Sequence, residues 1–216
     1  MKKLHIHYPA MVGLASLLFS GIATANPPPQ APAVAQPAQM VATVAPAAPT
    51  ASNVLEEGIT RLNFFIASGR AQDPVQMQRF VDKTIKPFFD FKRMAQLAAG
   101  PAWAQMNAQQ QEKFTQRVEG MFLKAFIRNV VSHRGPPPRT QFLPPRPSKD
   151  ASRIDLMARL LFPEGRTTRL VFRFAKSGGK WRAFDVSVDG KSAVLYYRSH
   201  FMKLAREGGI PAMLGS

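Results

Sequence analysis

The chain of 216 residues contains no cysteine. Disulfide bonds and cysteine-ligated metal sites are therefore excluded, and the fold does not depend on the redox state of its compartment. Acidic residues are also scarce, because 13 Asp and Glu stand against 29 Lys and Arg, which gives a formal net charge of +16. A chain this basic is expected to meet anionic surfaces or partners. Nucleic acid, phospholipid headgroups and acidic proteins all satisfy that expectation.

Residues suited to catalysis or metal binding are few as well. After the N-terminal segment the only histidines are His133 and His200, and neither has a carboxylate at ligand spacing. The sequence has neither a G-x-S-x-G motif nor a glycine-rich phosphate loop. We therefore predict no metal, no cofactor and no catalytic residue. The enzyme alternative is a pocket in which Asp185 and His133 form an acid/base pair, although structural hydrogen bonds at a strand end also explain Asp185.

The N-terminus has the order of a secretory signal peptide over residues 1–25. Lys2 and Lys3 precede a short apolar run over residues 11–22, and Ala23-Thr24-Ala25 then forms an A-x-A cleavage site. The apolar run is shorter than the ~20 residues that a membrane-spanning helix requires, and no cysteine follows it for lipid attachment. These features predict a bacterial protein that is exported and soluble. Residues 26–51 are rich in proline and alanine and predict a disordered linker.

Residues 52–214 predict one folded domain whose first half is helical. Apolar residues recur there at helical spacing between side chains that favour helix starts. These predicted starts are Asn53 with Glu56, Asp73-Pro74, Asp90, and Asn107 with Gln110. We expect the second helix to stop before Pro87 and the third to end at Gly100-Pro101.

The second half changes to the period of β-strands. The proline-rich segment predicts a short edge strand at residues 141–143. Apolar and basic residues then alternate over residues 153–162, 169–175 and 180–188. A last helix is expected from Ser192 to Gly208-Gly209. The predicted fold class is α+β, with helices packed on one face of a curved antiparallel β-sheet and an apolar pocket between them.

Two surplus residue types suggest binding functions. Arginines alternate with the apolar residues of the predicted strands and so form a basic face. This face is either a docking surface for headgroups or an acidic partner, or simply a solvated face. Its members are Arg153, Arg159, Arg169, Arg173 and Arg182, with Lys180 beside them. The 16 Phe against 3 Tyr indicate either a plain core or a pocket with few polar groups, of the kind that holds lipids. Nucleic acid is not expected as a partner, because an exported protein rarely meets it.

Two segments resemble a known family. The runs FVDKTIKP (residues 80–87) and FDFKRMA (residues 89–95) are similar to the opening pattern of the MlaC, or toluene-tolerance, family of auxiliary ABC-transport proteins, and Gly100, Trp103, Gln110 and Phe114 continue the match. KWRAFDVSVDG (residues 180–190) and YRSHF (residues 197–201) resemble the family's last strand and last helix. The resemblance spans residues 54–214. The sequence departs from the family in its long N-terminal linker and in the proline-rich residues 135–147.

The resemblance implies a soluble periplasmic lipid carrier without catalytic activity. We also expect the protein to be a monomer. It would hold phospholipid acyl chains between sheet and helices and shuttle lipid between an outer-membrane lipoprotein complex and an inner-membrane ABC transporter. A branch associated with hopanoids makes a polycyclic lipid the alternative cargo. The residues expected to line the pocket are Phe89, Met94, Leu97, Trp103, Phe122, Phe126, Leu156, Phe172, Trp181 and Tyr197.

Overall fold

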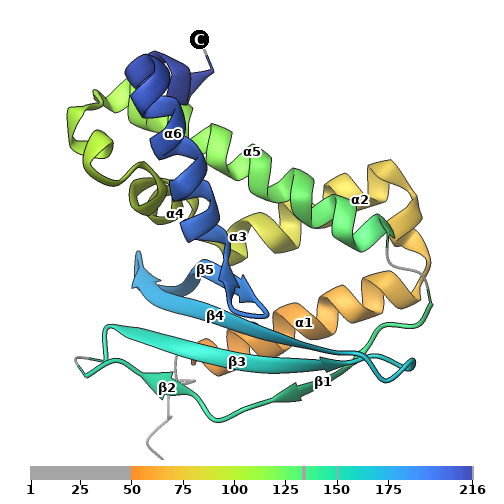
Figure 1. Ribbon diagram of the computed structural model, residues 1–216. Helices are drawn as coiled ribbons and strands as arrows, with labels where there is room; N and C mark the ends of the chain where they lie inside the picture. The colour runs from red at the N-terminus through yellow and green to blue at the C-terminus, as the bar shows by residue number, and fades with distance from the viewer. Residues whose placement is uncertain (1–49, 133–134, 150, 216) are drawn as a thin grey trace, which may run out of the picture. The chain divides into compact units, whose positions relative to one another are not determined.

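The computed structural model describes residues 50–132, 135–149 and 151–215, which form a layer of helices over a β-sheet (Figure 1). These residues belong to the compact unit Pro46–Ser216. The predicted signal peptide, nearly all of the predicted linker, and His133 lie outside the described residues.

The N-terminal half is helical, and polar side chains cap the helix starts. Its elements are α1 (Ala51–Ala67), the 3-10 turn η1 (Arg70–Gln72), α2 (Pro74–Phe80), the π turn η2 (Val81–Ile85), α3 (Lys86–Phe88), α4 (Phe91–Ala99), the 3-10 helix η3 (Gly100–Gln105) and α5 (Ala108–Ser132). The carboxylates of Asp73 and Asp90 accept backbone N–H bonds at the starts of α2 and α4, and Asn107 exchanges two 2.9 Å bonds with Gln110 before α5. These starts agree with the sequence.

The first helix begins earlier than its predicted cap. Thr50 is the N-cap, and Asn53 lies three residues further on as its partner in a capping box. The sequence pattern identified the right polar residue but placed it at the wrong end of the box.

Pro87 does not end the second helix, so that prediction is wrong. Proline lacks an N–H group, and its ring clashes with the carbonyl four residues before it. Just before Pro87, the backbone widens into the π turn η2, and the Lys86 N–H bonds to the Val81 carbonyl five residues back. The helical path therefore continues through α3 and places Phe88 and Phe89 against the sheet.

The C-terminal half is a six-stranded antiparallel sheet in the order β1-β3-β4-β5-β6, with β2 also pairing with β3. Its strands are β1 (Arg139–Phe142), β2 (Arg146–Pro147), β3 (Arg153–Leu161), β4 (Thr167–Ser177), β5 (Lys180–Val188) and β6 (Lys191–Ser192). The proline-rich segment thus supplies two short pieces along one edge of β3, where missing N–H groups do least harm.

The strands alternate as predicted until an irregularity in the pairing of β4 with β5. Leu156 pairs with Phe172 on the face toward the helices, whereas Arg159 pairs with Arg169 on the opposite face. The register then shifts between Arg173 and Phe174, so that Arg173 pairs with Asp185 but Phe174 pairs with Ala183. The extra residue, Phe184, moves Asp185 onto the arginine face.

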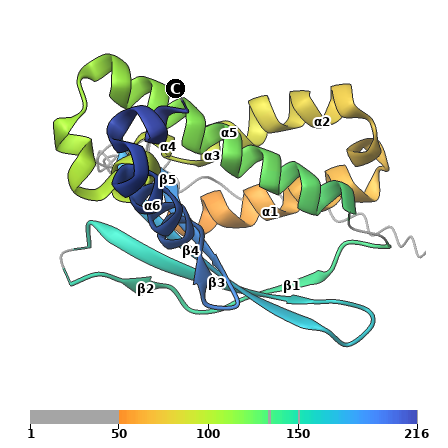
Figure 2. The ribbon, with the colours of Figure 1, turned by 45° about the horizontal axis from the view of Figure 1, so that its top comes forward.

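A backbone hydrogen bond and the start of the final helix help to join the helical layer to the sheet. The Asp90 N–H donates to the Ala183 carbonyl at 2.9 Å, which fixes the start of α4 on β5. The final helix, α6 (Ala193–Leu214), leaves β6 under the cap of Ser192 and rises beside α4 and α5 (Figures 1 and 2). Its backbone is non-helical at Gly208 and Gly209, as the sequence predicted, and one further turn follows. The predicted α+β class, with helices on one face of an antiparallel sheet, is confirmed.

Candidate functional site

The interface between helices and sheet is built from aromatic rings, which we call the aromatic cluster: Phe88, Phe89, Phe91, Phe122, Phe172 and Phe174. Phe88 and Phe89 end the helical path that passes Pro87, and their rings meet at 5.1 Å between centroids. Phe88 contacts Phe174 of β4 at 5.3 Å, and Phe89 contacts Phe122 of α5 at 4.6 Å. Two adjacent residues therefore connect the sheet to the longest helix through ring contacts.

The cluster is held by apolar contacts rather than by directional bonds. Most of its ring pairs are T-shaped, a geometry worth ~0.5–1.5 kcal/mol beyond area burial. Edge-to-face rings can change partners without leaving a polar group unsatisfied. This is the kind of interface that an apolar molecule can enter, because it exchanges one apolar contact for another.

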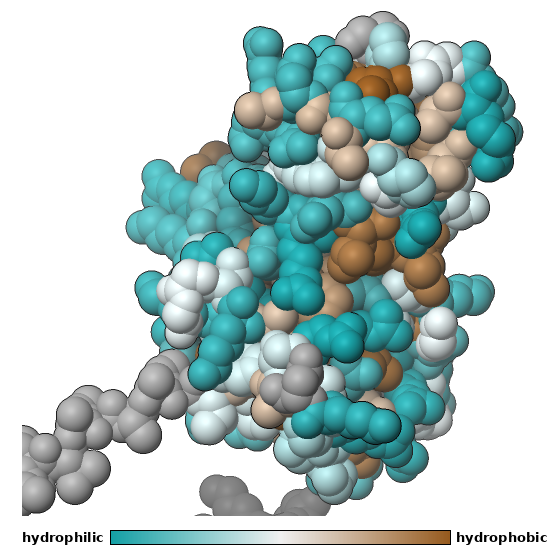
Figure 3. Space-filling view, turned by 90° about the vertical axis from the view of Figure 1, so that its left-hand side faces the viewer, coloured by the Kyte–Doolittle hydropathy of each residue, from teal (hydrophilic) through white to brown (hydrophobic). Residues whose placement is uncertain are grey.

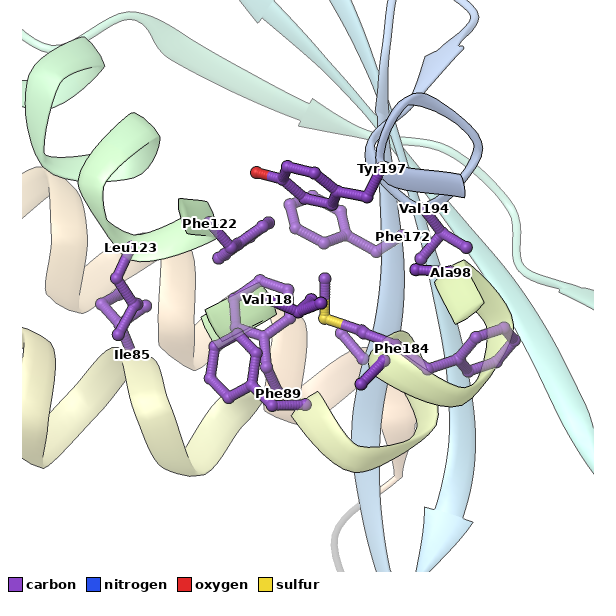
Figure 4. Close-up of a cluster of buried hydrophobic side chains, with 14 of the residues drawn as sticks. Ile85, Phe89, Ala98, Val118, Phe122, Leu123, Phe172, Phe184, Val194 and Tyr197 are labelled. Carbon is purple, nitrogen blue, oxygen red and sulfur yellow. The ribbon is translucent and has the colours of Figure 1, made fainter. Parts of the chain in front are cut away.

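Tyr197 places one polar group beside the cluster. Its side chain is buried at 6% exposure, and its ring extends from α6 over Phe172 with the hydroxyl leading (Figure 4). Burial raises the pKa of the Tyr197 phenol, with a smaller contribution from Tyr196. The interface is thus apolar, with one phenolic hydroxyl at its side.

Most of the ten residues predicted to line a pocket gather in or around this interface. Phe89, Phe122, Phe172, Met94, Leu156 and Tyr197 are buried, and Phe126, Trp103 and Trp181 are partly buried against the core. Leu97 is the exception, because it lies on the outer face of α4 with 38% exposure. Residues 94, 95, 98 and 99 form the inner face of that helix instead, so the prediction for Leu97 does not agree with its position.

Several buried residues near the aromatic cluster were not predicted from the sequence as lining residues. Figure 4 shows Ile85, Val118, Leu123, Phe184 and Val194 among the buried side chains near Phe122 and Tyr197. Val118 had a detectable signal, since it shares the helical stripe of Phe114 and Phe122. Phe184 had none, because its burial depends on the strand irregularity.

Two open grooves lie away from the aromatic cluster, and neither is lined by any of the ten residues predicted to line a pocket. One, of about 570 Å³, runs between η2 and α5 along Val81, Leu123 and Ile127. Across its rim Lys86 pairs with Glu119 at 3.0 Å and with Asp82 at 3.1 Å, and hydrogen bonds to these carboxylates raise the Lys86 pKa. The other, of about 600 Å³, lies beside η1 and α2.

The arginine face is less uniform than its sequence suggests. Arg153, Arg159 and Arg169 are exposed, and Arg182 is partly buried. Arg173 instead pairs with the buried Asp185 at 3.1 Å. The Asp185 carboxylate also accepts the Ser192 hydroxyl at 2.7 Å and the Val194 N–H at 3.1 Å. Asp185 and Arg173 therefore fasten the start of α6 to the sheet.

The described residues contain no group of three His, Asp or Glu side chains arranged to hold a metal ion. None of their helices combines the length and apolar character that crossing a membrane requires.

The face in Figure 3 is largely hydrophilic, with a hydrophobic patch at mid-height.

Comparisons with known proteins agree with this architecture. Residues 59–216 match the family model described as MlaC protein. A solved structure of a phospholipid-binding protein from Ralstonia solanacearum, in complex with a phospholipid, superposes with a TM-score of 0.69. The two proteins are 20% identical, and the match covers 77% of this chain and 94% of that chain. At this identity the likeness establishes the fold.

Proposed function

Because the chain belongs to the MlaC family, we propose that it is a periplasmic lipid carrier without catalytic activity. It binds the acyl chains of a phospholipid between its helices and its sheet. It shuttles the lipid between an outer-membrane lipoprotein complex and an inner-membrane ABC transporter. The related fold of a protein solved with a phospholipid supports the choice of cargo.

The observation that carries the proposal is the aromatic cluster between the two layers. Moving acyl chains from water into apolar surroundings yields ~0.8 kcal/mol per methylene, or on the order of 20 kcal/mol for about thirty methylenes before ordering costs. The rings that part around the chains keep apolar contacts, now with lipid. The gain is therefore large enough to separate edge-to-face ring pairs such as Phe89 and Phe122.

Tyr197 supplies the polar contact of such a site. A lipid's ester groups lie between its acyl chains and its headgroup, and the Tyr197 hydroxyl beside the cluster is suited to donate to an ester carbonyl. The headgroup then stays near solvent. The predicted lining residues other than Leu97 are assigned to this site.

The basic sheet face is assigned to docking. Arg153, Arg159, Arg169 and Arg182 present positive charge on the side away from the cluster, where an acidic partner surface can approach without touching the cargo. Arg173 is excluded from this role, because it pairs with Asp185.

Native mass spectrometry of the purified protein tests the carrier function. We expect a bound lipid that is released on unfolding, and its mass distinguishes a phospholipid from the alternative cargo, a hopanoid-type polycyclic lipid. The variant Phe122→Gln places a polar group in the cluster and is expected to lose the lipid, whereas Phe64→Gln, at a site 68% exposed, is expected to keep it. The carrier function is wrong if no lipid co-purifies and none can be loaded.

The same preparation addresses the enzyme alternative. The Asp185 carboxylate already accepts hydrogen bonds from three donors near the start of α6. His133 lies outside the described residues. Lipid released from the protein should be chemically unchanged after incubation. Altered lipid that depends on Asp185 and His133 would instead support catalysis.

A further inference from the structure

The turn between α1 and α2 carries exposed apolar side chains beside basic ones. Phe64 of α1 is 68% exposed and Val75 of α2 is 60% exposed. Both border the groove of about 600 Å³, together with Arg61, Arg70, Arg79 and Lys83. This turn lies at the end of the helical layer opposite α4 and α6 (Figures 1 and 2), so it is separate from the lipid site proposed above.

Two stacked rings line the same groove. Phe65 and Phe80 lie with ring centroids 4.2 Å apart and planes 4° from parallel. The Arg70 guanidinium lies 5.6 Å from the centre of the Phe64 ring and 5.7 Å from that of Phe65. Because Phe64 and Val75 are both more than half exposed, their side chains project toward solvent beside these rings.

The charge of this surface is positive. Its two nearby carboxylates are already engaged, since Glu57 pairs with Arg61 and Asp73 caps α2 through the N–H groups of Val75 and Gln76. Hydrogen bonds from those N–H groups lower the Asp73 pKa, so this carboxylate stays ionised in its capping role. Four basic side chains against two acids leave an excess of positive charge around the two apolar tips.

We propose that the surface formed by Phe64, Val75, Arg61, Arg70, Arg79 and Lys83 binds anionic lipid bilayers directly. A bilayer offers anionic headgroups with apolar material just beneath them, which suits projecting apolar tips in a ring of basic residues. The long arginine and lysine stems also keep their charges at headgroup level while the tips lie deeper. An acidic protein offers the charge but needs a shaped pocket for each tip. This contact is independent of the cargo site and would hold the carrier at a membrane surface.

The absence of cysteine makes the contact directly measurable. In the single-cysteine variant Val75→Cys, a polarity-sensitive dye reports only from this surface. We expect its emission to shift to the blue with vesicles of phosphatidylglycerol and phosphatidylcholine, and to stay unchanged with phosphatidylcholine alone. Leu195→Cys is the matched control, because Leu195 is equally exposed at 60% but lies on α6. An absent shift at Val75, or equal shifts at both sites, would overturn the proposal.

Vesicle sedimentation measures the contribution of charge. Each basic residue near an anionic surface is worth about fivefold in binding, so Arg79→Gln and Lys83→Gln should each weaken sedimentation by about that factor. Lys203→Gln, at a 70% exposed side chain of α6, should leave it unchanged. Binding that survives ~1 M salt, where the Debye length is ~3 Å, would contradict the electrostatic part. Cargo is followed separately by native mass spectrometry, so failure of the carrier function and failure of the membrane contact remain distinguishable.

Discussion

The buried carboxylate of Asp185 should be the most sensitive polar position in the domain. It is 1% exposed and accepts hydrogen bonds from the Arg173 guanidinium, the Ser192 hydroxyl and the Val194 N–H. In Asp185→Ala, two buried neutral donors lose their acceptor, at ~1–3 kcal/mol each. The Arg173 contribution is small, because that side chain is 41% exposed and water replaces much of the ion pair.

The expected loss for Asp185→Ala is therefore about 3 kcal/mol of unfolding free energy. For a domain of this size, 1 kcal/mol shifts the melting temperature by ~2–4 °C, so a fall of roughly 6–12 °C is expected. Asp185→Asn should lose less, because its carboxamide oxygen still accepts one of the bonds. Urea denaturation gives the free energies, and a thermal melt followed by circular dichroism gives the temperature shifts.

Asp155 provides the matched control. It lies opposite Arg173 on the neighbouring strand and is only half-buried, so Asp155→Ala should change stability by no more than about 0.5 kcal/mol. If Asp185→Ala unfolds together with the native protein, or if both alanine variants are equally damaging, the role assigned to Asp185 in fastening α6 is wrong.

Two further outcomes are expected. Burial raises the pKa of Tyr197 above its ordinary value of 10.0. The stability that this group contributes is therefore fully present below pH 10.0 and is lost as the pH rises through the folded-state pKa. Urea denaturation in that alkaline window should show a shallower loss of stability for Tyr197→Phe than for the native protein, and parallel losses would contradict the burial. The double variant Arg159→Glu with Arg169→Glu should keep its lipid in native mass spectrometry but lose lipid transfer to membranes carrying the partner complexes, whereas unchanged transfer would remove the docking role from the sheet face.

Local signals in the sequence were sufficient to predict most element boundaries. Asp73, Asp90, Asn107 and Ser192 cap helices as predicted, because a capping bond joins residues only two or three positions apart. The β-meander was equally accessible, since its alternation of apolar and basic residues is a property of each strand by itself.

Features that depend on tertiary packing were not predictable in this way. The π turn before Pro87 allows Phe88 and Phe89 to contact partners on the sheet and on α5, and those partners are distant in the sequence. The extra residue at Phe184 changes which side of the sheet Asp185 occupies, and no local pattern marks it. Leu97 fits the composition of a lining residue, but its place on α4 is decided by contacts with α5 and α6.

A comparison of two glycines tests how tightly α1 packs on the aromatic cluster. In an exposed helix interior, Gly→Ala stabilises by roughly 0.5–1 kcal/mol, because alanine restricts the unfolded chain and favours the helix. A Cβ added at Gly120 of α5 would meet no described atom within 4 Å outside the adjoining backbone of its own helix, so Gly120→Ala should show this gain. At Gly58 of α1 the added carbon would lie 3.0 Å from Cε2 and 3.3 Å from Cδ2 of Phe88.

Because of that contact, Gly58→Ala should lower the free energy of unfolding. The Phe88 ring also contacts Phe89, Phe172 and Phe174, so it cannot move away without disturbing three other rings, and overpacking of this kind costs ~1–3 kcal/mol. Urea denaturation should therefore rank Gly120→Ala above the native protein and Gly58→Ala below it. If Gly58→Ala is as stabilising as Gly120→Ala, the Phe88 ring moves freely and the cluster is looser than its ring contacts indicate.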